Sequence, residues 1–351
     1  MKKLLDRIFI DGLGGMAQGL FATLIIGTII QQIGLFMGGG TGDLIYELGK
    51  IAAGLTGAGI GVGVARKLEA GHLVIVSAAV VGMIGAFAGK ILSGQVLVDG
   101  NLVLAGPGEP LGAFIAAYLA IEIGILVTGK TKLDIILTPL VCIGTGSVVG
   151  LVAGPPISKF MAWLGSLINW GTEQQPFLMG IVVSVLMGIF LTLPISSAAI
   201  GVILNLSGLA AGAATVGCCC NMIGFAVASY RENKLGGFVA QGIGTSMLQM
   251  PNIIRHPQIW IPPILSSAIL GPVSTMLLHM TNNATGSGMG TAGLVGPLMT
   301  WQVMTASEDP MIVLVKMITI QFVLPAVVTL GISELMRKKK WIHPGDMKLE
   351  L

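Results

Sequence analysis

Charged residues are scarce in this sequence. Of its 351 residues only 10% are Asp, Glu, Lys or Arg, whereas an ordinary soluble domain carries roughly a quarter. So few charges cannot coat a soluble globule of this size, which excludes a cytosolic enzyme and a disordered chain. The formal net charge of +3 is too small to imply nucleic acid or another polyanion as a partner.

Cysteine is scarce as well, with four residues, three of them adjacent at 218–220. Such a set cannot make the disulfide scaffold of a secreted protein. Consecutive cysteines cannot close around one metal ion in tetrahedral geometry, and no pair has the spacing of a redox motif. We interpret the triplet as small residues packed in a helix, and we expect no metal, no cofactor and no catalysis by this chain alone.

Apolar residues and glycine are abundant instead. Hydrophobic residues make up 54% of the chain, the mean hydropathy is +0.89, and 52 residues are glycine. These values are typical of a polytopic membrane protein. Glycine, alanine and serine inside apolar runs allow close helix packing, and glycine also suits broken helices at membrane depth. The composition therefore predicts an all-α integral membrane protein with a transporter-like interior.

A membrane-spanning helix needs roughly 20 mostly apolar residues. The runs that satisfy this are residues 13–36, 44–65, 73–92, 111–128, 135–153, 177–195, 203–229, 259–280 and 311–333. The stretches 235–254 and 285–301 contain too much Gly, Pro and Asn for regular spans, and we expect two re-entrant hairpins there. Residues 157–170, with two Trp and a polar face, predict an interfacial amphipathic helix. We expect about ten crossings.

Basic residues indicate the orientation of the chain, because Lys and Arg favour cytoplasmic loops. They gather in five clusters, near residues 2–7, 66–67, 130–132, 231–234 and 337–340. The first three and the last predict that both termini are cytoplasmic. Simple counting places Arg231 and Lys234 on the wrong side, so either one middle span is not a full crossing or one has been missed.

The whole chain, 1–351, reads as a single transmembrane domain. Residues 1–11 are expected to form a short amphipathic lead-in rather than a cleaved signal peptide, because Asp6, Arg7 and Asp11 interrupt the apolar run. Residues 336–351 are expected to form a cytoplasmic tail.

Ionisable side chains inside apolar spans are costly and suggest function. Glu122 lies well inside the run 111–128. It is a candidate for substrate binding, and the alternative is a carboxylate that reaches water or pairs with a nearby base. His279 precedes a polar loop, where a ligand contact and a hydrogen-bonded structural histidine remain open alternatives.

Three polar, Gly-rich segments offer neutral hydroxyls and amides, which suit a small polar solute such as a polyhydroxy compound. They are residues 191–205, 242–257 and 279–297. The alternative is that these groups satisfy broken backbone and each other. The candidate substrate-binding residues are Ser196, Ser197, Thr245, Ser246, Gln249, Asn252, Arg255, His279, Asn282, Asn283 and Glu122.

The order of several motifs resembles a known family. The motifs are GPPISKF from residue 154, LTLPISSAAI from 191, GIGTSMLQMPNIIRHP from 242 and ATGSGMGTAGLVGP from 284. Together they resemble the EIIC membrane permease of the phosphotransferase system, of the fructose/mannitol type, and the whole chain is similar to the PfoR-type stand-alone EIIC-like proteins. The resemblance implies the EIIC architecture, a sugar-like solute, alternating access, a homodimer in the bacterial cytoplasmic membrane, and separate IIA and IIB phosphocarrier proteins.

The chain departs from the family pattern where charge is expected. Thr245 stands where the family has a glutamate, and Ser196 and Ser197 stand where it has Asn-Lys. No IIB segment is present in this sequence. We therefore expect a solute transporter without its own phosphorylation chemistry. The alternative hypothesis is a membrane sensor or regulator that kept the fold and does not transport.

Overall fold

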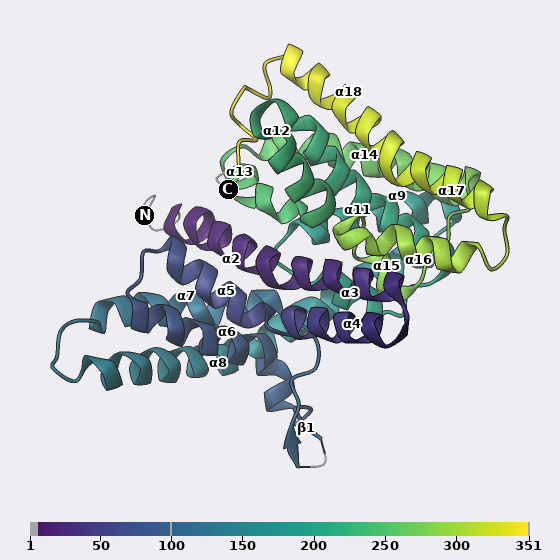
Figure 1. The fold of residues 1–351 in the computed structure, drawn as a ribbon. Coiled ribbons are helices and arrows are strands. Elements are labelled where there is room, and N and C mark those ends of the chain that lie inside the picture. Colours follow the sequence, from purple (N-terminus) through teal and green to yellow (C-terminus); the bar gives the residue numbers. More distant parts are fainter. Residues whose placement is uncertain (1–5, 99, 350–351) are drawn as a thin grey trace. The chain divides into compact units, whose positions relative to one another are not determined.

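The computed structural model describes residues 6–98 and 100–349, and they form two compact units. Unit 1 covers residues 1–161 and unit 2 covers residues 162–351, so the boundary falls inside one long helix. The described residues are almost entirely helical, with one short β-hairpin, Leu97–Val98 (β1) with Asn101–Leu102 (β2), that projects from unit 1 (Figure 1). The expectation of an all-α membrane protein is confirmed.

Unit 1 begins with one continuous helical rod from Arg7 to Met37, made of η1 (Arg7–Gly12), α2 (Leu13–Leu20), η2 (Phe21–Ile25) and α3 (Ile26–Met37). The predicted lead-in is part of this rod from Arg7 onward, and residues 1–5 lie outside the described residues. Two glycines with positive φ, Gly38 and Gly39, turn the chain into the next helix.

The chain returns through α4 (Gly39–Gly54) and α5 (Thr56–Lys67), which are bent by 50° relative to each other. α6 (His72–Leu92), α7 (Pro110–Val127) and the first part of α8 (Asp134–Thr172) complete unit 1. Close approach of backbones holds this unit together. A Cβ at Gly19 would overlap the carbonyl of Gly59 in α5, which explains why small residues fill these spans.

The predicted break before residue 157 is wrong, because α8 continues through Pro155 and Pro156 as one helix of 39 residues. Apolar helices tolerate proline where neighbouring groups satisfy the freed carbonyls. At 1.5 Å per residue α8 is about 58 Å long, nearly twice the thickness of a bilayer core of about 30 Å. Part of α8 must leave the core unless it is steeply tilted, and the interfacial position of residues 157–170 stays a prediction.

Unit 2 is built around α11 (Gly208–Ala228), of which 89% of the apolar window is buried. Three helical elements pack on it: α9 (Pro176–Thr192), the span Pro257–Leu277, and the span Pro310–Lys338. The second consists of η5 (Pro257–Trp260), α14 (Ile261–Pro272) and η6 (Val273–Leu277), and the third of α17 (Pro310–Ile318), η8 (Thr319–Val323) and α18 (Leu324–Lys338). Cys218, Cys219 and Cys220 are fully buried in α11, as expected for packing residues.

The two stretches predicted as broken are broken. The first contains α12 (Tyr230–Val239), η3 (Ala240–Gly244), η4 (Ser246–Gln249) and α13 (Met250–Arg255); the second contains α15 (Ala284–Ser287), η7 (Ala292–Leu294) and α16 (Val295–Met304). Both pack against α11. They meet where the hydroxyl of Thr291 donates to the carbonyl of Gly242.

Between Pro176 and Gly208 the chain runs out from one end of unit 2 and back to it. The hydroxyl of Thr275 donates to the carbonyl of Pro176, and Gly208 forms a β-bridge with Asn282. The starts of α9 and α11 therefore lie at the same end of unit 2, since residues 275–282 lie beside both. The chain leaves this end through α9 and returns to it through α10 (Ser197–Ile203). The interpretation of residues 177–195 as an ordinary crossing is corrected.

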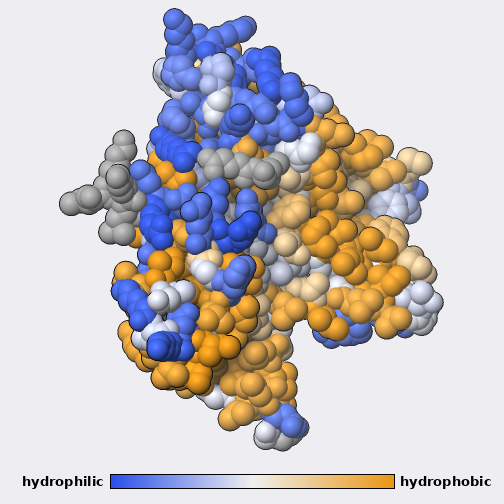
Figure 2. All heavy atoms as spheres, turned by 60° about the vertical axis from the view of Figure 1, so that its left-hand side comes forward, coloured by the Kyte–Doolittle hydropathy of each residue, from blue (hydrophilic) through white to orange (hydrophobic). Residues whose placement is uncertain are grey.

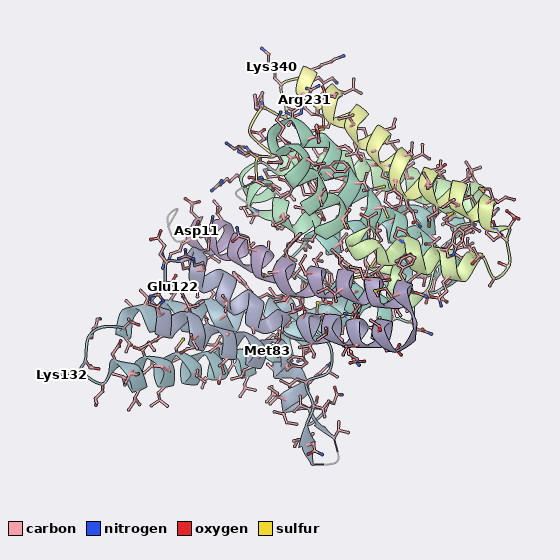
Figure 3. All side chains as sticks on the ribbon, viewed as in Figure 1. Asp11, Met83, Glu122, Lys132, Arg231 and Lys340 are labelled. Carbon is pink, nitrogen blue, oxygen red and sulfur yellow. The ribbon has the colours of Figure 1, made fainter. Side chains whose placement is uncertain are left out.

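This return removes the conflict in the basic clusters. Arg231 lies 3.2 Å from Glu334, and Arg337 lies 3.1 Å from Glu232, so Arg231 belongs to the same end of unit 2 as the run 337–340. Figure 3 shows Arg231 and Lys340 near each other at that end. In Figure 2 hydrophilic residues gather at the top of the view, and the flank to the lower right of them is largely hydrophobic.

Seven described helices are long and apolar enough to cross a membrane, or eight if the bent pair α4–α5 counts as one span. α9, with 17 residues, falls just below this length. The described residues therefore contain fewer membrane-length helices than the ten crossings expected. Seven or eight such helices still define a multi-pass membrane protein.

Candidate functional site

Unit 2 contains three networks of buried amide and hydroxyl side chains around α11. We name the first the central network. It consists of Thr192, Asn221, Ser246, Trp260 and Ser267. It joins the end of α9, the middle of α11, the first broken segment and the span that follows it.

Asn221 connects the members of the central network. Its Oδ1 accepts from Trp260 Nε1 at 3.1 Å and from the hydroxyl of Thr192 at 3.3 Å, and its Nδ2 lies 3.4 Å from the Ser267 hydroxyl. Ser246 lies 2.8 Å from Thr192. Of these residues only Ser246 is a sequence candidate. An asparagine in the middle of an apolar span is the signal that could have revealed Asn221.

The second network includes the end of the chain, and we name it the tail network. Its side chains are Ser229, Asn233, Gln241, Gln249 and Asn252, and its acceptors include the main-chain carbonyls of Met347 and Lys348. Two predicted residues, Gln249 and Asn252, thus come together, with Asn252 Nδ2 2.9 Å from Gln249 Oε1. Both are buried.

The third network surrounds Asn282, which is 1% exposed. The side-chain nitrogen Nδ2 of Asn282 lies within 3.1 Å of the Thr215 hydroxyl, the Thr300 hydroxyl and the Gly296 carbonyl. Gln321 Nε2 extends this set by donating to the same hydroxyl of Thr300 at 2.8 Å. Because every partner is a buried polar group, the network satisfies the broken backbone of the second segment.

Several predicted residues stabilise local turns. Ser196 accepts from the amide of Ala199 at the start of α10, Thr245 accepts from the amide of Met247 at the start of η4, and Asn283 accepts from the amide of Gly286 at the start of α15. Such side chains satisfy amide groups that a helix start leaves unpaired.

The remaining candidates of unit 2 differ in burial. Ser197 is buried and donates to the carbonyl of Gly288, which ties α10 to the second broken segment. Arg255 and His279 are exposed, and His279 has a positive φ of 49°.

Glu122 belongs to unit 1, where it forms an ion pair with Arg7. Glu122 Oε1 lies 2.6 Å from Arg7 Nε, and the two side chains are 30% and 38% exposed. The pair joins α7 to the first rod, and Figure 3 labels Glu122 on α7. A basic partner was one of the two alternatives for this carboxylate, and its role as a solute contact stays a prediction.

We expect Glu122→Gln and Arg7→Gln each to lower the melting temperature by only a few degrees, because the pair is partly exposed and such pairs contribute about 1 kcal/mol. A double-mutant cycle followed by thermal unfolding measures this coupling. A carboxylate with a role in transport would instead change the pH dependence of flux in Glu122→Gln while Arg7→Gln kept the wild-type profile.

The described residues contain no group of three or more His, Cys, Asp and Glu side chains that could hold a metal ion. The polar groups that unit 2 gathers are neutral amides and hydroxyls. Such groups bind oxygen-rich neutral molecules through hydrogen bonds.

Membrane-length helices around two broken segments lined with buried amides define a polytopic membrane protein of the transporter class. The family described as "Phosphotransferase system, EIIC" matches residues 10–349. The chain therefore belongs to the EIIC family, whose members are membrane components of transporters. No curated protein matches the chain at a significant level.

Proposed function

We propose that the protein binds a small polar, sugar-like solute in unit 2 and moves it across the membrane by alternating access, without phosphorylation chemistry of its own. The observation that carries this proposal is the concentration of neutral donors on the first broken segment, where Gln249 and Asn252 lie side by side. Broken helices that present polar groups to a solute are typical of transporters. Membership of the EIIC family supports the sugar-like class.

The proposal includes a location and partners. Arg231 and the basic run 337–340 lie at one end of unit 2, and they favour a cytoplasmic carboxyl terminus in a bacterial cytoplasmic membrane. The basic residues near the amino terminus favour a cytoplasmic position for that terminus as well. Exposed apolar side chains on α3 and α4, such as Phe36, Leu44 and Ile51, suit either lipid or a second copy. We infer a homodimer there, with separate IIA and IIB proteins as partners.

The second candidate function is a sensor or regulator that binds the solute without moving it. Thr245, Ser196 and Ser197 stand in place of the glutamate and the Asn-Lys pair of the resemblance, and they favour this function. The burial of Gln249 and Asn252 beneath the end of the chain favours it as well. Uptake of labelled hexoses and hexitols into proteoliposomes separates the two functions. Solute-dependent thermal stabilisation with no flux would support the sensor.

In the same assay we expect Thr245→Ala and Asn252→Ala to weaken solute-dependent stabilisation about tenfold in apparent Kd, because each removes a group that binds through one hydrogen bond. The solute-free protein should lose only a few degrees in melting temperature. Thr305→Ala is the matched control, since its hydroxyl donates to the carbonyl of Trp301 four residues earlier, away from the first broken segment. Unchanged binding in both site variants would place the solute elsewhere.

A further inference from the structure

The last described residues, 341–349, fold back onto the first broken segment of unit 2. α18 ends at Lys338, and the stretch 341–349, which we name the tail segment, has no helix or strand of its own. Asn233 Nδ2 and Gln249 Nε2 both donate to the carbonyl of Met347, at 2.8 and 3.0 Å. Asn252 Nδ2 donates to the carbonyl of Lys348 at 2.9 Å. Three side-chain amides thus converge on two oxygen atoms.

The three side-chain amides bind oxygen atoms of the tail segment, and the oxygen atoms of a solute could take the same positions. These three bonds run from a side-chain donor to a main-chain oxygen, so the tail segment contributes acceptors that an oxygen-rich molecule can replace. One further bond runs the other way, because the amide of Leu349 donates to Asn233 Oδ1 at 2.8 Å, and a solute hydroxyl can donate in its place. If the tail segment left, each of the three amides would lose one acceptor. Gln249 Nε2 would keep Gln241 Oε1 and Asn252 Nδ2 would keep Gln249 Oε1, and one N–H of each amide would be free to bind another oxygen atom. Water or a ligand with two suitably spaced oxygens would take the place of the lost acceptors.

The tail segment is attached in a manner that permits release. Only Ile342, Asp346 and Met347 of the described tail residues are buried, and Met347 is 0% exposed. Outside the tail network its anchor is Glu232, whose Oε1 accepts from the amide of Gly345 at 3.1 Å. A short irregular segment held by a few side chains and hydrogen bonds belongs to the parts of a protein that open locally most easily.

Glu232 also connects the tail segment to the end of α18, because Arg337 donates to the same Glu232 Oε1 at 3.1 Å. Asp346 adds a smaller contact, with its carboxylate accepting from the amide of His343 at 2.8 Å and lying 3.7 Å from His256. These contacts hold the tail segment at the end of unit 2 that carries the basic run, so release there would open the amides toward that end.

We propose that Asn233, Gln249 and Asn252 form a donor site for the oxygen atoms of the solute and that the tail segment is an internal plug that closes it. The proposal rests on the proposed function for the identity of the solute. It adds Asn233 to the site, and it gives the chain a device that keeps the site closed until the tail segment leaves. In a sensor the same device would report occupancy of the site.

Accessibility of position 252 tests the plug without any solute. Two full-length variants in nanodiscs, Asn252→Cys and Arg255→Cys, are each labelled with a maleimide-linked polyethylene glycol. Arg255 is exposed and lies three residues after Asn252, so its variant gives the labelling rate of an accessible cysteine. The four native cysteines are buried, so their background is low. With the tail docked we expect labelling at 252 to be at least about tenfold slower than at 255.

Release of the tail should abolish this difference. Met347→Lys places a charge at a fully buried position, and Glu232→Ala removes the anchor outside the site. We expect either change to bring labelling at 252 to within about threefold of labelling at 255. Trp341→Lys is the matched control, because it adds the same charge to the same segment at a position that is 55% exposed, and it should leave labelling slow.

Limited trypsin digestion at Lys338, Lys339 and Lys340 reports tail release independently. Fast labelling at 252 in the unaltered tail would overturn the plug. So would slow labelling in variants whose tail has become cleavable, since other elements would then cover the site. A tail that resists trypsin in both Met347→Lys and Glu232→Ala is a fixed part of the fold, which also contradicts the proposal.

Solute binding forms a separate arm. We expect hexitols and hexoses, as probes, to stabilise Met347→Lys at about tenfold lower concentration than Trp341→Lys, because the plug no longer competes. If the site opens in the labelling assay and none of these probes stabilises either protein, the plug stands and the proposed solute function fails.

Discussion

Replacing Gly217 by alanine is expected to prevent stable folding of unit 2. A Cβ at Gly217 would overlap the main-chain carbonyl of Ser184 in α9. Neither backbone can move easily, because α11 is packed on all sides and Ser184 is bonded to the carbonyl of Ser267 in α14. Forcing a methyl group into such a contact costs about 3 kcal/mol, a large fraction of a typical stability of 5–15 kcal/mol.

Size-exclusion chromatography and thermal unfolding in detergent measure this effect. Gly331→Ala in α18 is the matched control, because no atom lies near a Cβ built at that position. The control should keep or slightly raise the melting temperature, since alanine favours a helix by about 1 kcal/mol over glycine. Equal melting temperatures in the two variants would mean that α9 and α11 do not approach each other this closely.

Replacing Asn282 by alanine should be the most damaging of the changes at the candidate residues. The change removes the amide that lies between Thr215, Thr300 and the carbonyl of Gly296, and each of these groups is buried in unit 2. A buried polar group left without its partner costs about 1–3 kcal/mol. With more than one group affected, we expect a loss of about 3 kcal/mol and poorly folded protein.

Asn283→Ala is the neighbour to compare. Asn283 is half-buried and caps α15, a helix of four residues, so its loss should cost about 1 kcal/mol. The measurement is the melting temperature of the solute-free proteins, followed by solute titration of whichever variant folds. If Asn282→Ala folds as well as Asn283→Ala and has lost solute binding, Asn282 is a solute contact rather than part of the scaffold.

The spans show how much local patterns predict. α6 is His72–Leu92 where the apolar run predicted 73–92, and α7 is Pro110–Val127 where it predicted 111–128. Both helices are bounded by polar or glycine-rich loops, so hydropathy alone defines their ends. The two broken stretches were also predictable, because Gly, Pro and Asn disfavour regular helices wherever the chain lies.

Patterns failed where a neighbour decides the conformation. The motif GPP at 154–156 predicts a turn, yet α8 continues through it. α9 looks like an ordinary span, yet α9 and α10 lead out and back, and only the contacts of Pro176 and Gly208 with residues 275–282 reveal this. A local sum over hydropathy contains no information about which end of the unit a helix starts from.

The candidate site shows the same division. Gln249 and Asn252 are three residues apart, so their proximity follows from a single helical turn. Asn221, Thr192 and Trp260 were missed, because their hydrogen bonds join residues between 29 and 39 positions apart. Asn233 and Met347 are 114 positions apart, and neither would be chosen from its neighbours in the sequence.

By itself, the sequence determined that this protein lives in a membrane, that two stretches of it are broken helices, and that its polar interior is made of neutral amides and hydroxyls. These are properties of composition and of short windows, and burial in lipid enforces them residue by residue. Only the tertiary structure decided which donor meets which acceptor, because hydrogen bonds inside a bundle depend on close approach of distant segments. That is why residues 341–349, which the sequence presents as part of a simple tail, lie against the amides that the solute is proposed to use.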